Sequence, residues 1–180
     1  MDSAILFALL AAAAFLAFRL TWIWFTSRGD RLVTCPETRQ PVGVTVDTKH
    51  AAWTGIAHTP ALRLNTCTRW PERKDCGQKC LAEIAAAADG CLVHNILSKW
   101  YADKSCAICG KPIGEIHWSD HRPALLNPER QTVDWTQVRT ETLPRTLETH
   151  APVCWNCHIV QTFCHEHPDL VVDRSRPSRL

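Results

Sequence analysis

The chain has 180 residues and a formal charge of only +2, and ten of its residues are cysteine and nine are histidine. So small a charge argues against nucleic acid as a partner, because gripping it takes many clustered lysines and arginines. The excess of cysteine, beside a single methionine and a single tyrosine, indicates a fold held by metal or disulfides rather than by a large apolar core.

Residues 4–25 form an apolar stretch whose only charge is Arg19. At about 1.5 Å per residue, a helix of this length reaches about 33 Å, enough to cross a bilayer. Trp22 and Trp24 suit the aromatic belt of a membrane interface, toward which Arg19 can extend. A cleaved signal peptide is the alternative, but it would carry Lys or Arg before the apolar run, where this chain has only Asp2. We therefore expect an uncleaved transmembrane anchor.

The charges beside this anchor predict its orientation. Arg28 and Arg31 follow the apolar stretch, whereas no basic residue precedes it. The positive-inside rule then gives a single-pass protein of the inner or plasma membrane with its soluble region in the cytoplasm. In that reducing compartment we expect the cysteines to be thiolate ligands and not disulfides.

The fold class expected is α+β, with one N-terminal transmembrane helix and a small Cys-rich, zinc-stabilised soluble region. A linker over 26–34 leads into a Cys-rich module at 35–103 and a zinc module at 104–170, and the Pro- and Arg-containing tail 171–180 is expected to be disordered. Periodicity and turn residues predict strands at 41–47, 61–65, 115–118 and 132–135, and helices at 78–88, 92–101, from Thr142 onward, and at 156–165.

Two Cys-x-x-Cys pairs carry the strongest chemical signal: Cys106-Ala-Ile-Cys109, followed by Gly110, and Cys154-Trp-Asn-Cys157. Each pair aims two thiolates at one point, and the glycine lets backbone amides point at the sulfurs. Two such turns complete a tetrahedral four-sulfur site, which is a geometry that zinc accepts. Unconnected buried cysteines are the alternative. We expect these four cysteines to bind one zinc ion.

The first half of the chain offers a second candidate metal site, made of Cys35, Cys67, Cys76 and Cys80. The spacing of Cys76 and Cys80 would place both thiols on one helix face, and the other two lie at strand edges. Zinc is favoured over an iron–sulfur cluster because no familiar cluster spacing occurs. A Cys-rich core without metal is the alternative, and Cys91 is interpreted as an ordinary buried thiol.

The stretch 106–163 resembles the treble-clef zinc folds, in which a Cys-x-x-Cys-Gly turn on a hairpin is joined by a second Cys-x-x-Cys at the start of a helix. In such a fold the positive end of the helix would help to hold the thiolate charge. The resemblance implies a treble-clef-like module, related to zinc ribbons, in the second half of the chain.

The same stretch is similar to the zinc-bearing members of the HNH endonuclease family, which have an Asp-His pair between the two cysteine pairs and a Cys-His at the helix start. The matching residues are Asp120, His121 and His158. The resemblance implies that His121 activates water and that His158 holds a catalytic divalent cation. The family's middle asparagine is absent, and His150 is the candidate ligand in its place, with Asp120 as a further carboxylate.

Cys154, Cys157 and His158 also match the Cys-x-x-Cys-His attachment signature of c-type haem. That interpretation needs a periplasmic domain and a second histidine as distal ligand, and it leaves Cys106 and Cys109 without a role.

The function favoured by the sequence is that of a membrane-anchored zinc-binding protein with a structural or interaction role, for example an accessory subunit of a membrane complex. Its expected partners are the membrane and one or more proteins, and a non-catalytic role is favoured over an enzyme. The alternatives are an HNH-like metal-dependent nuclease and an electron carrier that uses an iron–sulfur cluster or c-type haem.

Overall fold

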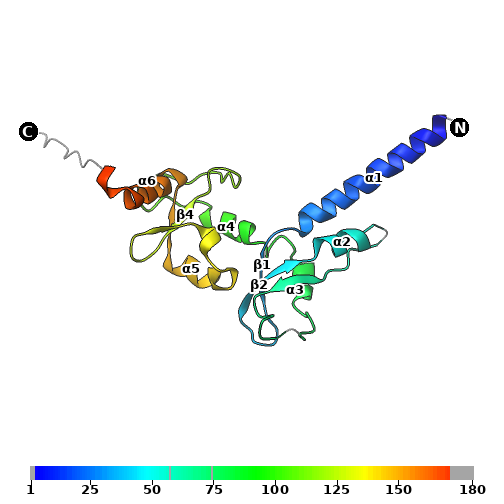
Figure 1. Ribbon diagram of the computed structural model, residues 1–180, viewed down its shortest axis with the longest axis horizontal. Coiled ribbons are helices and arrows are strands. Elements are labelled where there is room, and N and C mark those ends of the chain that lie inside the picture. Colours follow the sequence, from blue (N-terminus) through cyan, green and yellow to red (C-terminus); the bar gives the residue numbers. More distant parts are fainter. Residues whose placement is uncertain (1–2, 57, 74, 171–180) are drawn as a thin grey trace, which may run out of the picture. The chain divides into compact units, whose positions relative to one another are not determined.

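The computed structural model describes residues 3–56, 58–73 and 75–170, and it has a mixed helix-and-strand fold that begins with an apolar helix (Figure 1). The chain divides into two compact units, Met1–Ile96 and Leu97–Leu180, called here the first and second units. The expected tail at 171–180 lies outside the described residues.

Helix α1 (Ser3–Ser27) is long and apolar enough to cross a bilayer, although a signal sequence near an N-terminus fits the same description. Its last turns join the first unit, since Ile23 and Ser27 are buried. Arg19, which was expected to extend freely along a membrane interface, is instead hydrogen-bonded to the first unit. Its Nε donates to the carbonyl of Gly55 at 2.8 Å, and its Nη2 donates to the carbonyl of His58 at 3.2 Å.

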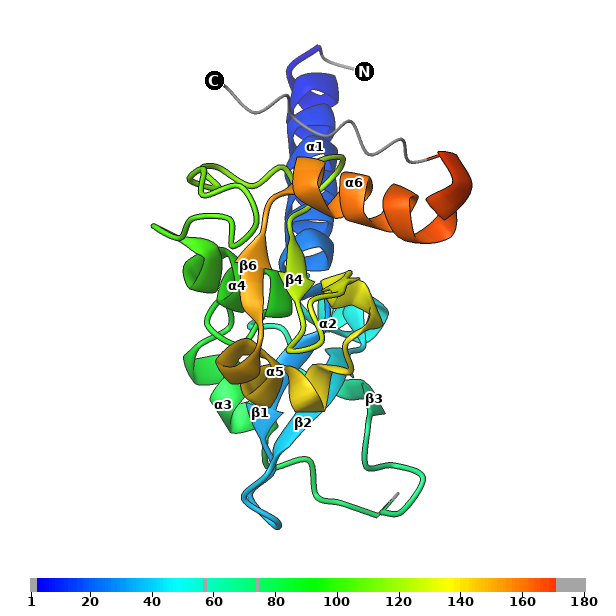
Figure 2. The same ribbon diagram turned by 90° about the vertical axis from the view of Figure 1, so that its left-hand side faces the viewer.

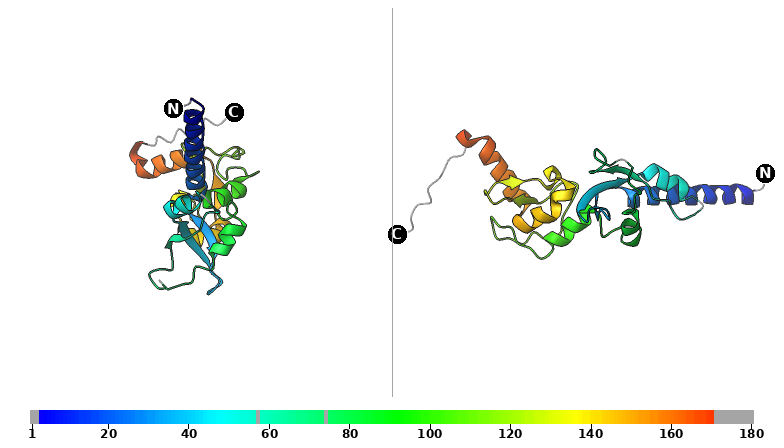
Figure 3. Two further views of the ribbon diagram at one scale, coloured as in Figure 1. Left: turned by 90° about the vertical axis from the view of Figure 1, so that its right-hand side faces the viewer. Right: turned by 90° about the horizontal axis from the view of Figure 1, so that it is seen from below.

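Helix α2 (Thr48–Thr54) lies against the C-terminal end of α1 (Figure 3). Asp47 caps its N-terminus by accepting a hydrogen bond from the amide of His50. A glycine is required at the other end, because a Cβ built on Gly55 would lie 2.5 Å from the Cδ1 atom of Ile23. The close approach of α1 and α2 therefore depends on the absence of a Cβ atom at Gly55.

The first unit contains an antiparallel sheet of order β1-β2-β3, formed by β1 (Arg31–Thr34), β2 (Pro41–Val46) and β3 (Leu64–Cys67). Leu32 pairs with Gly43, and Val44 pairs with Cys67. Helix α3 (Leu81–Ala86) supplies Ile84 to the apolar core of this unit. The core is completed by buried valine and leucine side chains from the three strands: Val33, Val42, Val44, Val46 and Leu64.

Three expectations for the first unit are corrected. The stretch 26–34 is mostly regular structure rather than linker, because it contains the end of α1 and all of β1. Helix α3 is shorter than the expected 78–88, since Gln78 has a φ of 49° and Ala87 leaves the helix with a φ of −144°. The strand expected at 61–65 begins only at Leu64.

Helix α4 (Val93–Tyr101) crosses the boundary between the units and confirms the expected helix at 92–101. The second unit has an antiparallel sheet of order β5-β4-β6, in which β4 (Ala124–Leu126) lies between β5 (Thr132–Val133) and β6 (Ala151–Val153). Figure 2 shows β4 beside β6. The remaining elements are α5 (Leu143–Thr149), α6 (Trp155–Glu166) and three 3-10 turns at Trp135–Gln137, Thr140–Thr142 and Pro168–Leu170.

The core of the second unit surrounds the central strand β4. Leu125 and Val153 are completely buried, and Leu143 of α5 is nearly so. The buried hydroxyl of Tyr101 donates to the carbonyl of Ala124 at 2.7 Å, which fixes the end of α4 to this strand. The sheet therefore places the start of α6, directly after β6, on a rigid base.

The strand expected at 115–118 is absent. Within the described part of that stretch, pairing is limited to an isolated bridge between His117 and His121. Thr142 does precede α5 at the N-cap position, and Pro144 lies in the first turn, as expected. The Thr142 hydroxyl, however, donates to the carbonyl of Arg139 and does not cap the helix.

Candidate metal centre

The Sγ atoms of Cys106, Cys109, Cys154 and Cys157 all lie within 4.8 Å of one another, and this set is called here the Cys cluster. The sulfurs of Cys109 and Cys154 are 3.8 Å apart. Around a tetrahedral zinc ion with Zn–S bonds of about 2.3 Å, neighbouring sulfurs lie about 3.8 Å apart. The four cysteines are therefore close enough together to hold a metal ion.

A tight turn positions the first pair. The amide of Cys106 donates to the carbonyl of Lys111 at 2.8 Å, and the amide of Gly110 donates back to the carbonyl of Cys106 at 2.9 Å. Gly110 has a φ of +72°, a conformation that glycine adopts without the strain other residues would meet. These contacts make the first Cys-x-x-Cys a tight turn, which an isolated bridge between Ser105 and Pro112 extends.

The second pair lies where β6 becomes α6. Cys154 is the extended residue before the helix and Cys157 lies in its first turn, so both thiols sit at the positive end of the α6 dipole. The amide of Ala107 donates to the carbonyl of Pro152 at 2.8 Å. This bond ties the first turn to β6 and explains how two pairs so distant in sequence meet.

The pKa values of Cys106, Cys154 and Cys157 are shifted, and not all in the same direction. Burial opposes a negative charge on Cys106 and acts to raise its pKa. The amides of Cys109, Cys154 and Ile108 donate to its sulfur and outweigh burial, so that its pKa is lowered to about 6. Burial raises the pKa of Cys154, and burial with the neighbouring thiols raises that of Cys157. A divalent cation must displace the protons held by the latter two, so affinity for it should fall as the pH falls.

In the first unit, Cys35, Cys67, Cys76 and Cys80 line a single cavity of about 30 Å³. These four are called here the first-unit cysteines. Among the residues that the structure describes, the Cys cluster is the only group of metal-ligating atoms so close together, so the first-unit cysteines are gathered less tightly. Cys80 caps α3 and Cys76 lies in the preceding loop, so the expectation that the two share a helix face is wrong.

Two of these thiols differ in their ionisation. Burial opposes a charge on Cys35, but hydrogen bonds from the amides of Thr38 and Glu37, the Thr38 hydroxyl and the Arg69 guanidinium lower its pKa to about 7. The Arg69 Nη1 lies 3.0 Å from the sulfur. Burial raises the pKa of Cys80 to about 11, with the neighbouring thiols adding to it. Outside this cavity, the thiol of Cys91 is buried as expected.

The histidines of the HNH-like pattern are only partly brought together. His121 and His158 both contact the ring of Trp155, with ring centroids 6.0 and 6.2 Å from it. His121 pairs with Asp120 at 3.0 Å, and His158 shares a hydrogen bond of 3.0 Å with Thr132.

The cation site implied by that pattern does not assemble. The Nδ1 atom of His150 lies 2.9 Å from the hydroxyl of Thr149, next to it in the chain. Within the described ranges, Asp120, His121, His150 and His158 do not form a group of ligand atoms close enough to hold an ion.

The sequence indicates only a flanking charge for Arg31, but its side chain is buried in the first unit and is 2% exposed. The signal that could have revealed this is its place in β1, two residues before the buried Val33 and therefore on the same face of the strand.

No family model, curated protein or solved structure matches the chain. The Cys cluster therefore has to be interpreted from its own geometry. It is a possible metal site of four cysteines in a mixed helix-and-strand fold that also carries one long apolar helix.

Proposed function

We propose that this protein is a membrane-anchored zinc protein whose second unit is a treble-clef-like module with a structural and interaction role, as an accessory subunit of a membrane complex. The observation that carries the proposal is the convergence of four thiols at the spacing of a zinc–sulfur tetrahedron. Four thiolates leave no open coordination position for a substrate, which is typical of structural rather than catalytic zinc.

The contacts at the end of α1 support the proposed anchor. Ile23 is 7% exposed and packs where Gly55 lacks a side chain, and Arg19 donates to two carbonyls of the loop after α2. Cleavage of α1 as a signal peptide would remove these contacts from the first unit. With Arg28 beyond the helix, the positive-inside rule supports a protein of the inner or plasma membrane whose residues after Ser27 face the cytoplasm.

The interaction role is supported by helix α6. Ile159, Val160 and Phe163 are 44%, 58% and 47% exposed, and their spacing places them on one face of the helix. No residue of α6 is buried. An apolar face on an exposed helix, directly after the Cys cluster, is a surface that a protein partner would cover.

The first-unit cysteines are proposed as a second zinc site. The thiols share one small cavity, and hydrogen bonds already favour the charged form of Cys35. A zinc ion there would draw the four sulfurs together, as in the Cys cluster, at Zn–S distances of about 2.3 Å.

The interaction role is tested on the complex extracted from the native membrane. Val160→Asp with Phe163→Asp places two charges on the apolar face of α6, and we expect the complex solubilised in mild detergent to shrink to the free chain in a native gel. Gln161→Asp is the matched control, because Gln161 lies on another face of the same helix and is also exposed. Zinc content should be unchanged in both variants. A wild-type chain that migrates alone, or a complex that survives the double substitution, would contradict the role.

The second candidate function is an HNH-like nuclease, favoured by the placement of His121 and His158 on the same tryptophan. Cleavage requires a base aimed at water and a cation beside the scissile phosphate, and imidazoles alone bind Mg²⁺ weakly because that ion prefers oxygen ligands. We expect the full chain in detergent to leave plasmid DNA intact with Mg²⁺, Mn²⁺ or Ni²⁺. Metal-dependent nicking that disappears in His121→Ala, with zinc retained, would establish the nuclease instead.

A further inference from the structure

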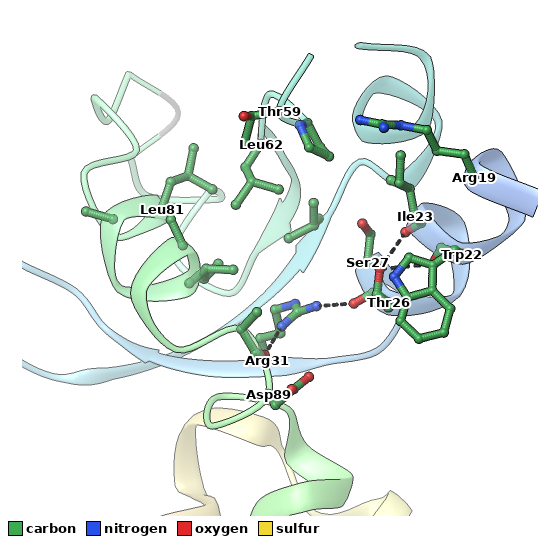
Figure 4. Close-up of a pocket in the computed structure, with 16 residues that line it drawn as sticks. Arg19, Trp22, Ile23, Thr26, Ser27, Arg31, Thr59, Leu62, Leu81 and Asp89 are labelled. Carbon is green, nitrogen blue, oxygen red and sulfur yellow. Dashed lines mark hydrogen bonds between the residues drawn. The ribbon is translucent and has the colours of Figure 1, made fainter. Parts of the chain in front are cut away.

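A cavity of about 790 Å³ opens in the first unit between the end of α1 and helix α3 (Figure 4). We call it the Arg31 cavity. Its volume is within the range of pockets that hold small molecules. Most of its lining is apolar, from α1, β2, the loop before β3, and α3: Trp22, Ile23, Val46, Pro60, Leu62, Leu81, Ile84 and Ala85.

The buried guanidinium of Arg31 lies at the base of this cavity. Figure 4 shows Arg31 reaching from β1 toward Thr26 and Ser27 at the end of α1. Its Nη2 donates to the carbonyl of Thr26 at 2.8 Å. Its Nη1 donates to the carbonyl of Ala88 and, at 3.6 Å, to the sulfur of Cys91. Its buried Nε has no hydrogen-bond partner. A guanidinium that is 2% exposed and has one polar atom unsatisfied is costly unless an anion compensates for it.

Among the described residues, no carboxylate serves as this anion. In the part of the chain that the structure describes, no carboxylate lies within 4.0 Å of a nitrogen of Arg31. Asp89 borders the cavity but is exposed and makes no ion pair there. The half-buried Arg19 adds a second positive charge on the α1 side. The cavity therefore combines apolar walls with a positive potential, which suits an amphiphile with a negatively charged head.

The position of the cavity along α1 indicates where such a molecule would come from. About 20 residues of a helix cross the hydrocarbon core, so a span that starts at Ser3 ends near Trp22. The α1 residues that line the cavity run from Arg19, about one turn before that point, to Ser27, so the cavity lies where the hydrocarbon core meets the lipid headgroups. The cavity would open where phosphates and the upper parts of acyl chains are present at high local concentration.

We propose that the Arg31 cavity binds an anionic phospholipid of the bilayer that α1 enters, with an acyl chain on the apolar walls and the phosphate drawn to the arginines. This inference rests on the membrane anchoring proposed above. A bound lipid would contact both the end of α1 and helix α3. It would therefore fix the orientation of the first-unit sheet relative to the membrane surface.

The test fills the cavity without disturbing the core. Ala85 of α3 lines the cavity and is exposed, so Ala85→Trp adds an indole to the space. Ala86→Trp is the matched control, because Ala86 is an exposed neighbour on the same helix that does not line the cavity. The full-length proteins are reconstituted into vesicles of phosphatidylcholine and phosphatidylglycerol, extracted in detergent, and the retained lipid is identified by native mass spectrometry.

We expect the wild type and Ala86→Trp to retain phosphatidylglycerol in preference to phosphatidylcholine, and Ala85→Trp to retain it about tenfold less. Arg31→Met, if it folds, should bind both lipids without preference. Equal retention in Ala85→Trp, or no preference in the wild type, overturns the proposal. Displacement of the lipid by inorganic phosphate alone would show that the site takes a soluble anion, which also overturns it.

Two further measurements separate the lipid site from the membrane anchoring and the zinc site. Zinc content and the intact mass of the chain are measured on the same samples. A chain that has lost α1, or that lacks zinc, contradicts the proposed function, whereas a zinc-loaded, α1-bearing chain without bound lipid contradicts the lipid site alone.

Discussion

Replacing Cys157 by Ser is expected to remove the metal from the second unit and to leave that unit without a stable fold. Structural zinc contributes about 10–16 kcal/mol of apparent binding free energy to small domains at neutral pH. That is as large as the whole stability of an ordinary domain, about 5–15 kcal/mol. The core around Leu125 and Val153 is small, and the start of α6 is held to the first turn through the Cys cluster. Zinc content should fall by about one ion per chain.

Limited proteolysis provides the structural measurement for this prediction. In Cys157→Ser the second unit should be cut rapidly, whereas the first unit should keep its protection, because its sheet has a core of its own. Cys164→Ser is the control, since Cys164 lies on the same helix and outside the Cys cluster. Protease resistance and zinc content equal to the wild type in Cys157→Ser would refute the site.

Two charges at the centre of α1 are expected to abolish membrane anchoring. By insertion scales an arginine at the middle of a transmembrane helix costs about 2.5–3.5 kcal/mol, so Ala12→Arg with Ala13→Arg costs about 5–7 kcal/mol. Both alanines lie in the exposed, uncharged part of α1. Alkaline carbonate should then extract the double variant from membranes while the wild type stays in the pellet.

Ala12→Leu with Ala13→Leu is the matched control, and it should anchor at least as well as the wild type. An arginine variant that resists extraction would show that something other than α1 holds the protein at the membrane. A mature wild-type chain that lacks α1 altogether would show the helix to be a signal sequence.

The sequence predicted the elements whose signals are local. The Cys-x-x-Cys-Gly turn needs only a tight hairpin and a glycine with positive φ, and both are present at Gly110. Helix α6 begins and ends close to the expected 156–165 because the cysteine motif opens it and Pro168 follows its end. Helix α5 begins after Thr142 with Pro144 in its first turn, where a proline costs no hydrogen bond.

What the sequence did not predict depends on tertiary packing. Strands β4 and β6 are three residues each, too short for a periodic pattern, and β6 contains Pro152. They form because they are hydrogen-bonded neighbours in the sheet of the second unit.

Arg31 and Arg19 also differ from the sequence-based prediction because of tertiary contacts. Arg31 is a flanking charge by its place in the chain, but the fold of β1 against Ala88 and Thr26 buries it. Arg19 is a snorkelling candidate on an isolated helix, but the carbonyls after α2 take up its hydrogen bonds. The carbonyls that hold Arg19 are 36 and 39 residues away, and that of Ala88 is 57 residues from Arg31, so the local sequence does not reveal these contacts.

X-ray absorption at the zinc edge reports whether the Cys cluster holds zinc as a closed four-sulfur site. The measurement uses the full-length chain purified in detergent without added metal. We expect a zinc ion whose first shell is four sulfurs at about 2.3 Å, in a colourless protein. A shell of nitrogen or oxygen at about 2.0–2.1 Å, a protein without zinc, or a coloured chain that carries iron instead would contradict it.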